Sequence, residues 1–374
     1  MHRLIRLALL LLCCVGASVE AAPIYKIETV AQGLNHPWAV QFLPNGDMLI
    51  TEKLGGLRIV RAGKLDPQPI AGVPKAYQET DCGILDLALD PDFATNGRIF
   101  IAFSQGDVKA NHMAMFRARF DGKALRQGRI IFRSARNKAK GSHCGSRIVF
   151  LADKTFVMTI GDGYDYRDEA QNLDSDLGKT VRLNRDGKVP SSNPFVRRAN
   201  ARSEIYTYGH RNPQGLLRDP RNGQLWLHEH GPKGGDEINL LKPGANYGWP
   251  KTTYGVDYSG AIISNLKEAP GIVAPNVVWV PSIAPSGFAL YLGDKFPAWQ
   301  GDFFVGALAE KSLRRVRISN GKPVTQEVLL RELDARIRDV REGPDGYLYV
   351  LTDEENGRLL RLTPAACAAT CERK

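Results

Sequence analysis

The chain repeats one pattern of polar and apolar positions six times. Each copy is a turn containing Asp, Pro, Asn or Gly, followed by a short alternating run rich in β-forming residues. The copies occupy residues 43–51, 92–103, 151–160, 219–228, 299–306 and 343–352. They lie roughly 45 to 80 residues apart, which fits one four-stranded blade per copy plus insertions. With no long helical periodicity, the pattern predicts an all-β, six-bladed β-propeller, and a generic β-sandwich is the alternative.

A propeller must close its ring. One terminus usually adds a strand to the blade begun by the other, which removes an exposed sheet edge. Residues Ile24–Val30 can form such a strand. We expect them to pair in the last blade, near Arg358–Leu362.

The first residues have the features of a secretory signal peptide. Met1–Arg6 is basic, Leu7–Val15 is apolar, and Val19–Ala21 offers small residues where a signal peptidase cuts. The apolar run is well short of the roughly 20 residues that span a bilayer, so a membrane anchor is the less favoured alternative and no stable membrane insertion is expected. We predict a signal peptide at 1–21, a propeller at 22–363, a C-terminal tail at 364–374 and a periplasmic protein.

The chain is basic, with 50 Lys and Arg against 40 Asp and Glu and a formal net charge of +10. The basic residues are scattered among acidic ones and are not interleaved with aromatic residues. Export also removes the usual opportunity to meet nucleic acid. A nucleic-acid partner is therefore not predicted, and a smaller acidic ligand is favoured.

Four cysteines remain once a signal peptide is removed: Cys82, Cys144, Cys367 and Cys371. An even number in an exported chain indicates disulfides, and four cysteines allow three pairings. The simplest scheme joins Cys367 to Cys371 and Cys82 to Cys144. Free thiols stay open as an alternative, because the sequence gives no distances.

Two polar stretches, Tyr206–Gly215 and Trp226–Asn239, stand out between strand-like runs. Together they contain an arginine, amide side chains, a His-Glu-His run, a Gly-Pro pair and an acidic pair. Buried polar groups need specific partners, so hydrophobic packing alone would not favour so many of them here. The region is therefore predicted to be a functional site.

Eight motifs follow one another in a specific order, although none is decisive alone. They are Gly33–Ala39, Asp86–Phe93, His143 with Ser146 and Arg147, Gly209–Gly215, Glu229–Pro232, Gly235–Asn239, Asn246–Pro250 and Arg336–Val340. Together they resemble the soluble quinoprotein sugar dehydrogenases, most closely the bacterial aldose sugar dehydrogenases of the glucose/sorbosone dehydrogenase family. The resemblance extends from about Ala31 to Thr363.

This resemblance implies a six-bladed propeller that binds pyrroloquinoline quinone (PQQ) and Ca²⁺ at one mouth of its channel. It implies an enzyme that oxidises the anomeric carbon of an aldose to a lactone and passes electrons to an external acceptor. By the same resemblance, His143 is the general base, Asp162 orients it, and Arg211 stabilises charge on the cofactor. The other implied residues are Asn212, Gln214, Ser282, Lys311, Arg336 and Arg338 for cofactor binding, and the carbonyls of Gly231 and Pro232 for Ca²⁺.

These residue types suit such chemistry. Removing hydride from an alcohol carbon requires loss of the hydroxyl proton, which neutral imidazole can accept near pH 7. Ca²⁺ prefers oxygen ligands such as backbone carbonyls and would polarise the accepting carbonyl of a quinone. Arg336 and Arg338 lie two apart in an expected strand, so they share one face and can bind a polycarboxylate together.

Each assignment has a simpler alternative. His143 could be a structural histidine, and Arg336 with Arg338 could form a solvated strand face. His228 and His230 could instead form a His-x-His metal pair, although no third ligand is evident. For the whole chain, the alternative functions are a metal-dependent propeller hydrolase resembling lactonases and a non-catalytic carbohydrate-binding propeller.

Three features depart from the family's pattern. Asp81 stands where relatives have a glutamine, so a carboxylate lies near an anionic cofactor and would weaken binding unless it is protonated or paired. Ala309 aligns with the family's cofactor-binding lysine of the fifth blade, although Lys311 could reach from the same face. Cys82 and Cys144 are the third departure, and the resemblance implies that a disulfide joins them across the wall of the site.

Overall fold

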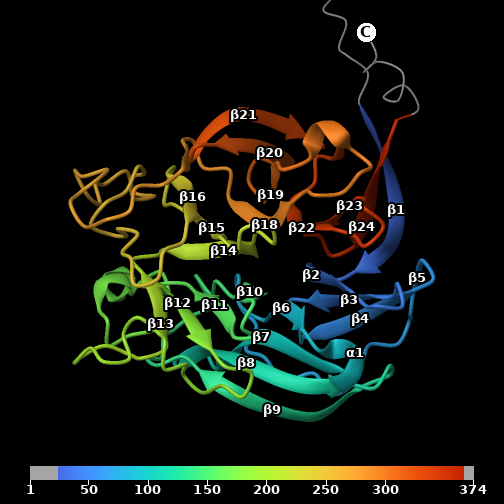
Figure 1. Cartoon of the computed structure of the whole chain (residues 1–374), viewed down its shortest axis with the longest axis horizontal. Helices are drawn as coiled ribbons and strands as arrows, with labels where there is room; N and C mark the ends of the chain where they lie inside the picture. The colour runs from blue at the N-terminus through green and yellow to red at the C-terminus, as the bar shows by residue number, and fades with distance from the viewer. Residues whose placement is uncertain (1–23, 366–374) are drawn as a thin grey trace, which may run out of the picture.

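A ring of six four-stranded antiparallel sheets forms the structure, a computed structural model that describes residues 24–365 (Figure 1). Each sheet is one blade, so the predicted all-β, six-bladed propeller is confirmed. The predicted signal peptide lies outside the described residues, as do Cys367 and Cys371.

The blades use consecutive groups of strands, except that the sixth also contains the first strand of the chain. Blade one contains β2 (Pro37–Phe42), β3 (Met48–Glu52), β4 (Gly56–Arg61) and β5 (Lys64–Leu65). Blade two contains β6 (Ile84–Leu89), β7 (Arg98–Gly106), β8 (Asn111–Phe120) and β9 (Leu125–Arg133). Blade three contains β10 (Ile148–Phe150), β11 (Phe156–Ile160), β12 (Lys179–Leu183) and β13 (Ile205–Tyr208).

The second half of the ring has the same organisation. Blade four contains β14 (Asn212–Arg218), β15 (Leu225–His230), β16 (Asp236–Leu240) and β17 (Val277–Trp279). Blade five contains β18 (Pro285–Leu290), β19 (Phe303–Ala307), β20 (Ser312–Ser319) and β21 (Lys322–Leu329). Blade six contains β22 (Ile337–Glu342), β23 (Leu348–Thr352), β24 (Gly357–Pro364) and β1 (Tyr25–Leu34).

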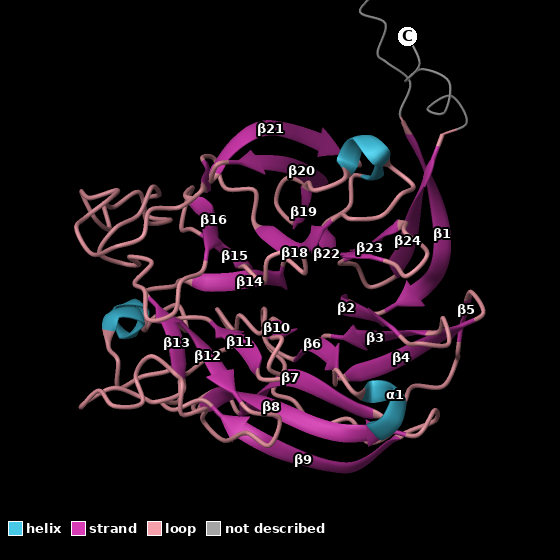
Figure 2. Ribbon diagram, viewed as in Figure 1, coloured by secondary structure: helices cyan, strands magenta, loops and turns pink. Residues whose placement is uncertain are grey.

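Between residues 24 and 365, helix is confined to short turns between strands (Figure 2). These are α1 (Phe93–Asn96) and the 3-10 turns η1 (Arg167–Gln171), η2 (Pro297–Trp299) and η3 (Arg331–Leu333). Within residues 24–365, no helix is long and apolar enough to cross a membrane.

Each repeated copy in the sequence corresponds to the second strand of a blade, often with the turn that precedes it. Copy 43–51, for example, runs into β3, and copy 343–352 includes β23. Every residue of β3, β11, β19 and β23 is buried, because these strands lie inside a sheet that is covered on both faces. This double burial explains why apolar residues dominate the repeat.

The ring closes as predicted. β1 pairs in antiparallel fashion with β24, and the partners include Thr29 with Leu360 and Ile27 with Leu362. The N-terminal strand thus forms the outer edge of the sixth blade (Figure 1). This pairing joins the two ends of the described chain in one sheet and protects the β24 edge.

The first strands of blades one to five and β22 of blade six contact one another around the ring, so they form its inner wall. A buried network of ion pairs links these strands. Arg147, which precedes β10, lies 2.9 Å from Asp339 of β22, an ion pair without hydrogen-bond geometry. Arg341 lies 3.0 Å from Asp339 and 2.9 Å from Asp86 of β6. The Arg147 guanidinium also lies 4.0 Å from the centre of the Trp38 ring.

Because Arg147 is part of this network and its side chain is only 2% exposed, we predict that replacing it strongly destabilises the fold. Arg147→Met leaves the buried Asp339 carboxylate short of a cation, and we expect the free energy of unfolding in urea to fall by about 3–5 kcal/mol. Arg126→Met is the control, because Arg126 pairs with Asp121 at the surface and should leave the urea midpoint nearly unchanged. Equal midpoints for the two variants would contradict a role for the network in holding the blades together.

Candidate functional site

The histidine predicted to be the base lies in the segment that leads into β10. His143 Nδ1 is 2.6 Å from the Asp162 carboxylate, and the His143 backbone has φ +52°, in the left-handed region. The carboxylate fixes the tautomer by accepting the Nδ1 proton. Nε2 makes no hydrogen bond to any residue between 24 and 365, and the ring lines a pocket of about 360 Å³. The structure therefore presents a basic nitrogen to a ligand-sized pocket.

Asp162 is fully buried and accepts two further hydrogen bonds. Trp249 Nε1 donates to it over 2.7 Å, and the Tyr164 backbone N–H donates over 2.8 Å. The Asp162 N–H in turn donates to the Arg211 carbonyl over 2.8 Å. Three donors hold the carboxylate in one position, so His143 is oriented from blades three and four together.

Arg211 lies on the same pocket as His143, directly before β14. Its Nη1 donates to the Gly231 carbonyl over 2.6 Å, and its guanidinium lies 5.4 Å from the centre of the Trp249 ring. Glu229 fixes its backbone by accepting the Arg211 N–H over 2.6 Å. Arg211, which is predicted to face the cofactor, therefore lines the same pocket as His143, the predicted base.

Asn212 and Gln214 connect this group to the neighbouring blades. Asn212 Oδ1 accepts the Gly145 N–H over 3.1 Å, and its Nδ2 donates to Asp81 over 3.3 Å. Gln214 Oε1 accepts from Arg338 Nη1 over 3.4 Å. Both amides lie on β14, and their hydrogen bonds link blade four to blades two, three and six.

Arg336 and Arg338 converge on Asp353, a residue that the sequence analysis did not select. Arg338 Nη2 lies 2.5 Å from the Asp353 carboxylate, and Arg336 Nε lies 3.7 Å from it. Burial opposes ionisation of Asp353, but Arg338 and His36 outweigh it and lower the carboxyl pKa. Arg338 is buried, and its Nε has no hydrogen-bond partner among residues 24–365. Arg338 is therefore not on a solvated strand face, whereas the Arg336 side chain is 46% exposed.

Ser282 and Lys311 lie apart from this group. The Ser282 hydroxyl donates to Asp236 over 2.6 Å, and Ser282 lines a different pocket, of about 520 Å³. Lys311 Nζ lies 2.9 Å from Asp334, and its side chain is 46% exposed. Neither residue lines the pocket that His143 and Arg211 share. The same is true of Asn212, Gln214, Arg336 and Arg338, which connect to that pocket through the hydrogen bonds and ion pairs described above.

The Gly231–Pro232 loop borders the pocket through Pro232. A Cβ on Gly231 would lie 2.3 Å from the Gly235 carbonyl group, so only glycine fits at this close approach. The Gly231 N–H donates to Asp236 over 2.8 Å, and its carbonyl accepts from Arg211. This carbonyl therefore faces a side chain that lines the mouth.

The interpretation of His228 and His230 as a metal pair is wrong. Their Nε2 atoms hydrogen-bond to the carbonyls of Gly287 over 2.9 Å and Pro285 over 2.7 Å. Burial lowers the pKa of His228 to about 3 and lowers the pKa of His230 as well. Within the described chain, no three His, Cys, Asp or Glu side chains gather as a metal site. Both histidines join blade four to blade five.

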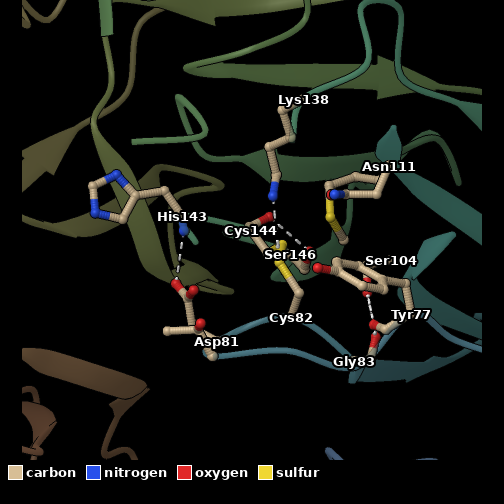
Figure 3. The surroundings of a disulfide bond; sticks show 12 residues. Tyr77, Asp81, Cys82, Gly83, Ser104, Asn111, Lys138, His143, Cys144 and Ser146 are labelled. Atoms are coloured by element: carbon tan, nitrogen blue, oxygen red, sulfur yellow. Dashed lines mark hydrogen bonds between the residues drawn. A yellow bond between two sulfur atoms is a disulfide. The ribbon is translucent and has the colours of Figure 1, made fainter. Parts of the chain in front are cut away.

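A disulfide joins Cys82 to Cys144, as predicted (Figure 3). Asp81, which precedes Cys82, accepts the His143 backbone N–H over 3.0 Å. Lys138 Nζ lies 3.5 Å from the Cys82 sulfur. The covalent link and the Asp81 hydrogen bond thus both attach the His143 segment to blade two. Asp81 accepts from two neutral donors, the His143 N–H and Asn212 Nδ2, but it forms no ion pair with any residue between 24 and 365, and its Oδ1 is buried without a hydrogen-bond partner there. Its expected repulsion of an anionic cofactor therefore stays a prediction.

The comparisons with known proteins agree with this geometry. A family model described as glucose/sorbosone dehydrogenase matches residues 34–361. The chain belongs to the glucose/sorbosone dehydrogenase family. This member is 42% identical over 360 residues to the aldose sugar dehydrogenase YliI of Escherichia coli, covering 94% of this chain and 97% of the relative. The predicted family is therefore confirmed.

Solved structures of the family have the same fold. The apo-form of the soluble aldose sugar dehydrogenase of Escherichia coli superposes with a TM-score of 0.88 at 41% identity, covering 91% of this chain and 100% of that one. The PQQ-bound aldose sugar dehydrogenase of Streptomyces coelicolor superposes with a TM-score of 0.74 at 27% identity, covering 91% and 100%.

The disulfide gives a testable prediction for this dehydrogenase family member. Peptide mapping without reductant should recover a cross-linked fragment containing Cys82 and Cys144. The Cys82→Ser, Cys144→Ser double variant should lose about 2–4 kcal/mol of unfolding free energy, because the bond closes a loop across a sequence separation of 62 residues. It should also lose turnover, since the His143 segment loses its link to blade two. Alkylation of both cysteines in unfolded, unreduced protein would contradict the bond.

Proposed function

We propose that this protein is a PQQ- and Ca²⁺-dependent quinoprotein that oxidises the anomeric carbon of aldoses to lactones and passes electrons to an external acceptor. The observation that carries the proposal is the His143–Asp162 pair, which faces one pocket together with Arg211. The PQQ-bound relative from Streptomyces coelicolor supports the choice of cofactor. The signal-peptide features of residues 1–21 and the Cys82–Cys144 disulfide support a periplasmic location.

The residues at the mouth fit an anionic cofactor. Arg338 has a buried Nε without a partner in the described chain, and Arg336 is only partly neutralised at 3.7 Å from Asp353. We infer that these two arginines hold carboxylates of PQQ, with Asn212 and Gln214 beside them and with Ser282 and Lys311 in the outer positions that the resemblance implies. The carbonyls of Gly231 and Pro232 are oxygen donors of the type that Ca²⁺ prefers.

When bound, PQQ and Ca²⁺ supply the hydride acceptor and its electrostatic activation. The chain supplies the remaining chemistry. His143 Nε2 accepts the proton of the anomeric hydroxyl while hydride leaves the same carbon, and Asp162 stabilises the imidazolium that results. Arg211 places positive charge at the mouth, where it favours the negative charge that develops on a reduced acceptor.

The alternative functions account for less of this arrangement. A metal-dependent hydrolase would use several carboxylates converging on one cation, and the described chain has no such cluster. A carbohydrate-binding propeller would not need a histidine held by a buried carboxylate with three donors. An oxidoreductase would use both the oriented base, His143, and the positive charge of Arg211 in the same pocket.

Activity should require both cofactors. Purified apo-protein is incubated with PQQ and Ca²⁺, and dye reduction is followed with a panel of aldoses. A chelator should stop the reaction and added Ca²⁺ should restore it, because no side chain replaces the cation's pull on the acceptor. Cleavage of lactones by the apo-protein with metal alone would instead identify the hydrolase.

His143→Ala should lower turnover by about 10²- to 10⁴-fold, the usual effect of losing a general base, while PQQ still binds. Asp162→Asn should cause a smaller loss, because the imidazole remains present. His112→Ala is the matched control, since His112 is a partly exposed histidine of β8 and should keep full turnover. Undiminished aldose oxidation by His143→Ala would remove His143 from the mechanism.

A further inference from the structure

A second cavity, of about 370 Å³, lies at the other end of the inner strands from the site described above. Gln214 and Arg338, which belong to that site, lie near the starts of β14 and β22. The last residues of these two strands line the second cavity, and the ends of β2 and β18 complete it. Figure 1 shows these four strands at the centre of the ring. Because a strand rises roughly 3.3 Å per residue, Arg218 at the cavity lies about 13 Å along β14 from Gln214. We call this space the far cavity.

Four polar side chains line the far cavity and keep hydrogen-bonding capacity that no residue between 24 and 365 uses. The Arg218 guanidinium and the Gln41 amide make no hydrogen bond or ion pair in this part of the chain. Arg341 donates through Nε and Nη2 within the buried ion-pair network, and its Nη1 has no partner among the described residues. One oxygen of Glu342 accepts a backbone N–H over 2.6 Å, which leaves the other oxygen for a ligand. The far cavity therefore offers both donors and acceptors.

The ionic groups at the far cavity cancel. The buried network contributes two cations and two anions, which are Arg147, Arg341, Asp86 and Asp339. Beyond this network, the cavity is lined by one further cation, Arg218, and one further anion, Glu342. An anionic ligand would gain from Arg218 but would meet the Glu342 carboxylate, and a cationic ligand would meet the reverse. The charges therefore favour a neutral ligand.

Apolar side chains form most of the remaining wall. The main ones are Val40, Phe42, Leu217, Phe288, Leu290 and Leu292. A purely apolar ligand would cover this wall but would leave the free donors of Arg218 and Arg341 without partners, which costs free energy. A sugar ring meets both demands, because each hydroxyl can donate and accept a hydrogen bond while the C–H groups of the ring form an apolar face.

We propose that the far cavity is a second ligand site, separate from the catalytic pocket around His143, and that it binds a neutral pyranose sugar. Arg218, Gln41 and Glu342 hydrogen-bond the hydroxyls, and the apolar wall packs against the C–H face of the ring. The volume of about 370 Å³ is close to the 360 Å³ of the catalytic pocket and lies in the range of small-molecule sites. The far cavity contains none of the residues assigned to the cofactor, to Ca²⁺ or to proton transfer, so the inference goes beyond the proposed function.

Methyl NMR can distinguish the two sites. Four leucine and valine residues line the far cavity and none lines the catalytic pocket, where Ile263 is the aliphatic reporter. Apo-protein labelled at Ile, Leu and Val methyl groups is titrated with D-glucose, and saturable shifts are expected at Leu217, Leu290 and Leu292. Arg218→Met should raise the dissociation constant from these shifts by about 10- to 100-fold, the range for losing a hydrogen bond from a charged group. Any titration of Ile263 should stay unchanged.

Arg221→Met is the matched control. Arg221 follows Arg218 closely in the chain but pairs with Asp219 over 2.7 Å and does not line the far cavity, so its loss should change the constant by less than about twofold. D-glucuronate, a pyranose that carries a carboxylate, should bind more weakly than D-glucose because of Glu342. Methyl signals away from the cavity serve as the folding control for each variant.

Three results would overturn the inference. D-glucose shifts no methyl group of the far cavity, Arg218→Met binds D-glucose as the unaltered protein does, or D-glucuronate binds more tightly than D-glucose. The test contains no PQQ, so its failure is distinguishable from a failure of the proposed function.

Discussion

The rest of the site depends on the buried carboxylate of Asp162. It accepts from His143, Trp249 and the Tyr164 backbone, so its negative charge is spread over three donors within a closed environment. Because a buried charge without partners is costly, these donors are fixed relative to one another. The position of the imidazole therefore follows from the packing of blades three and four, and the ring lines the pocket.

The propeller makes such convergence possible. Short segments that are far apart in the sequence bring polar groups together: His36 contacts Asp353, Asp81 and Asn212 contact the His143 segment, and Gln214 contacts Arg338. Bulges near the starts of five inner strands turn these segments out of the regular ladder. The Arg147–Asp339–Arg341–Asp86 network beneath the mouth holds the strands in register, and the Cys82–Cys144 disulfide fixes the His143 segment to blade two.

The fold could be predicted from the sequence because each blade repeats the same pattern, a polar turn followed by a short apolar strand. The strands β3 and β23 show that this pattern reflects burial, since every residue in them is buried. The site was predicted through motifs around His143 and Arg211. Asp353 was missed because its role depends on partners that are far away in the sequence, such as His36, which is 317 residues away. The suspected metal pair at His228 failed for the same reason, since its carbonyl partner on β18 is 59 residues away.

The most direct test of the account is a single turnover without an electron acceptor. Enzyme loaded with PQQ and Ca²⁺ is mixed anaerobically with an aldose that carries hydrogen or deuterium at the anomeric carbon, and the absorption spectrum of the cofactor is followed. The account predicts reduction of one cofactor per enzyme, more slowly with the deuterated sugar, because hydride leaves that carbon while His143 accepts the proton. A cofactor that stays oxidised in the loaded enzyme with every aldose would contradict it.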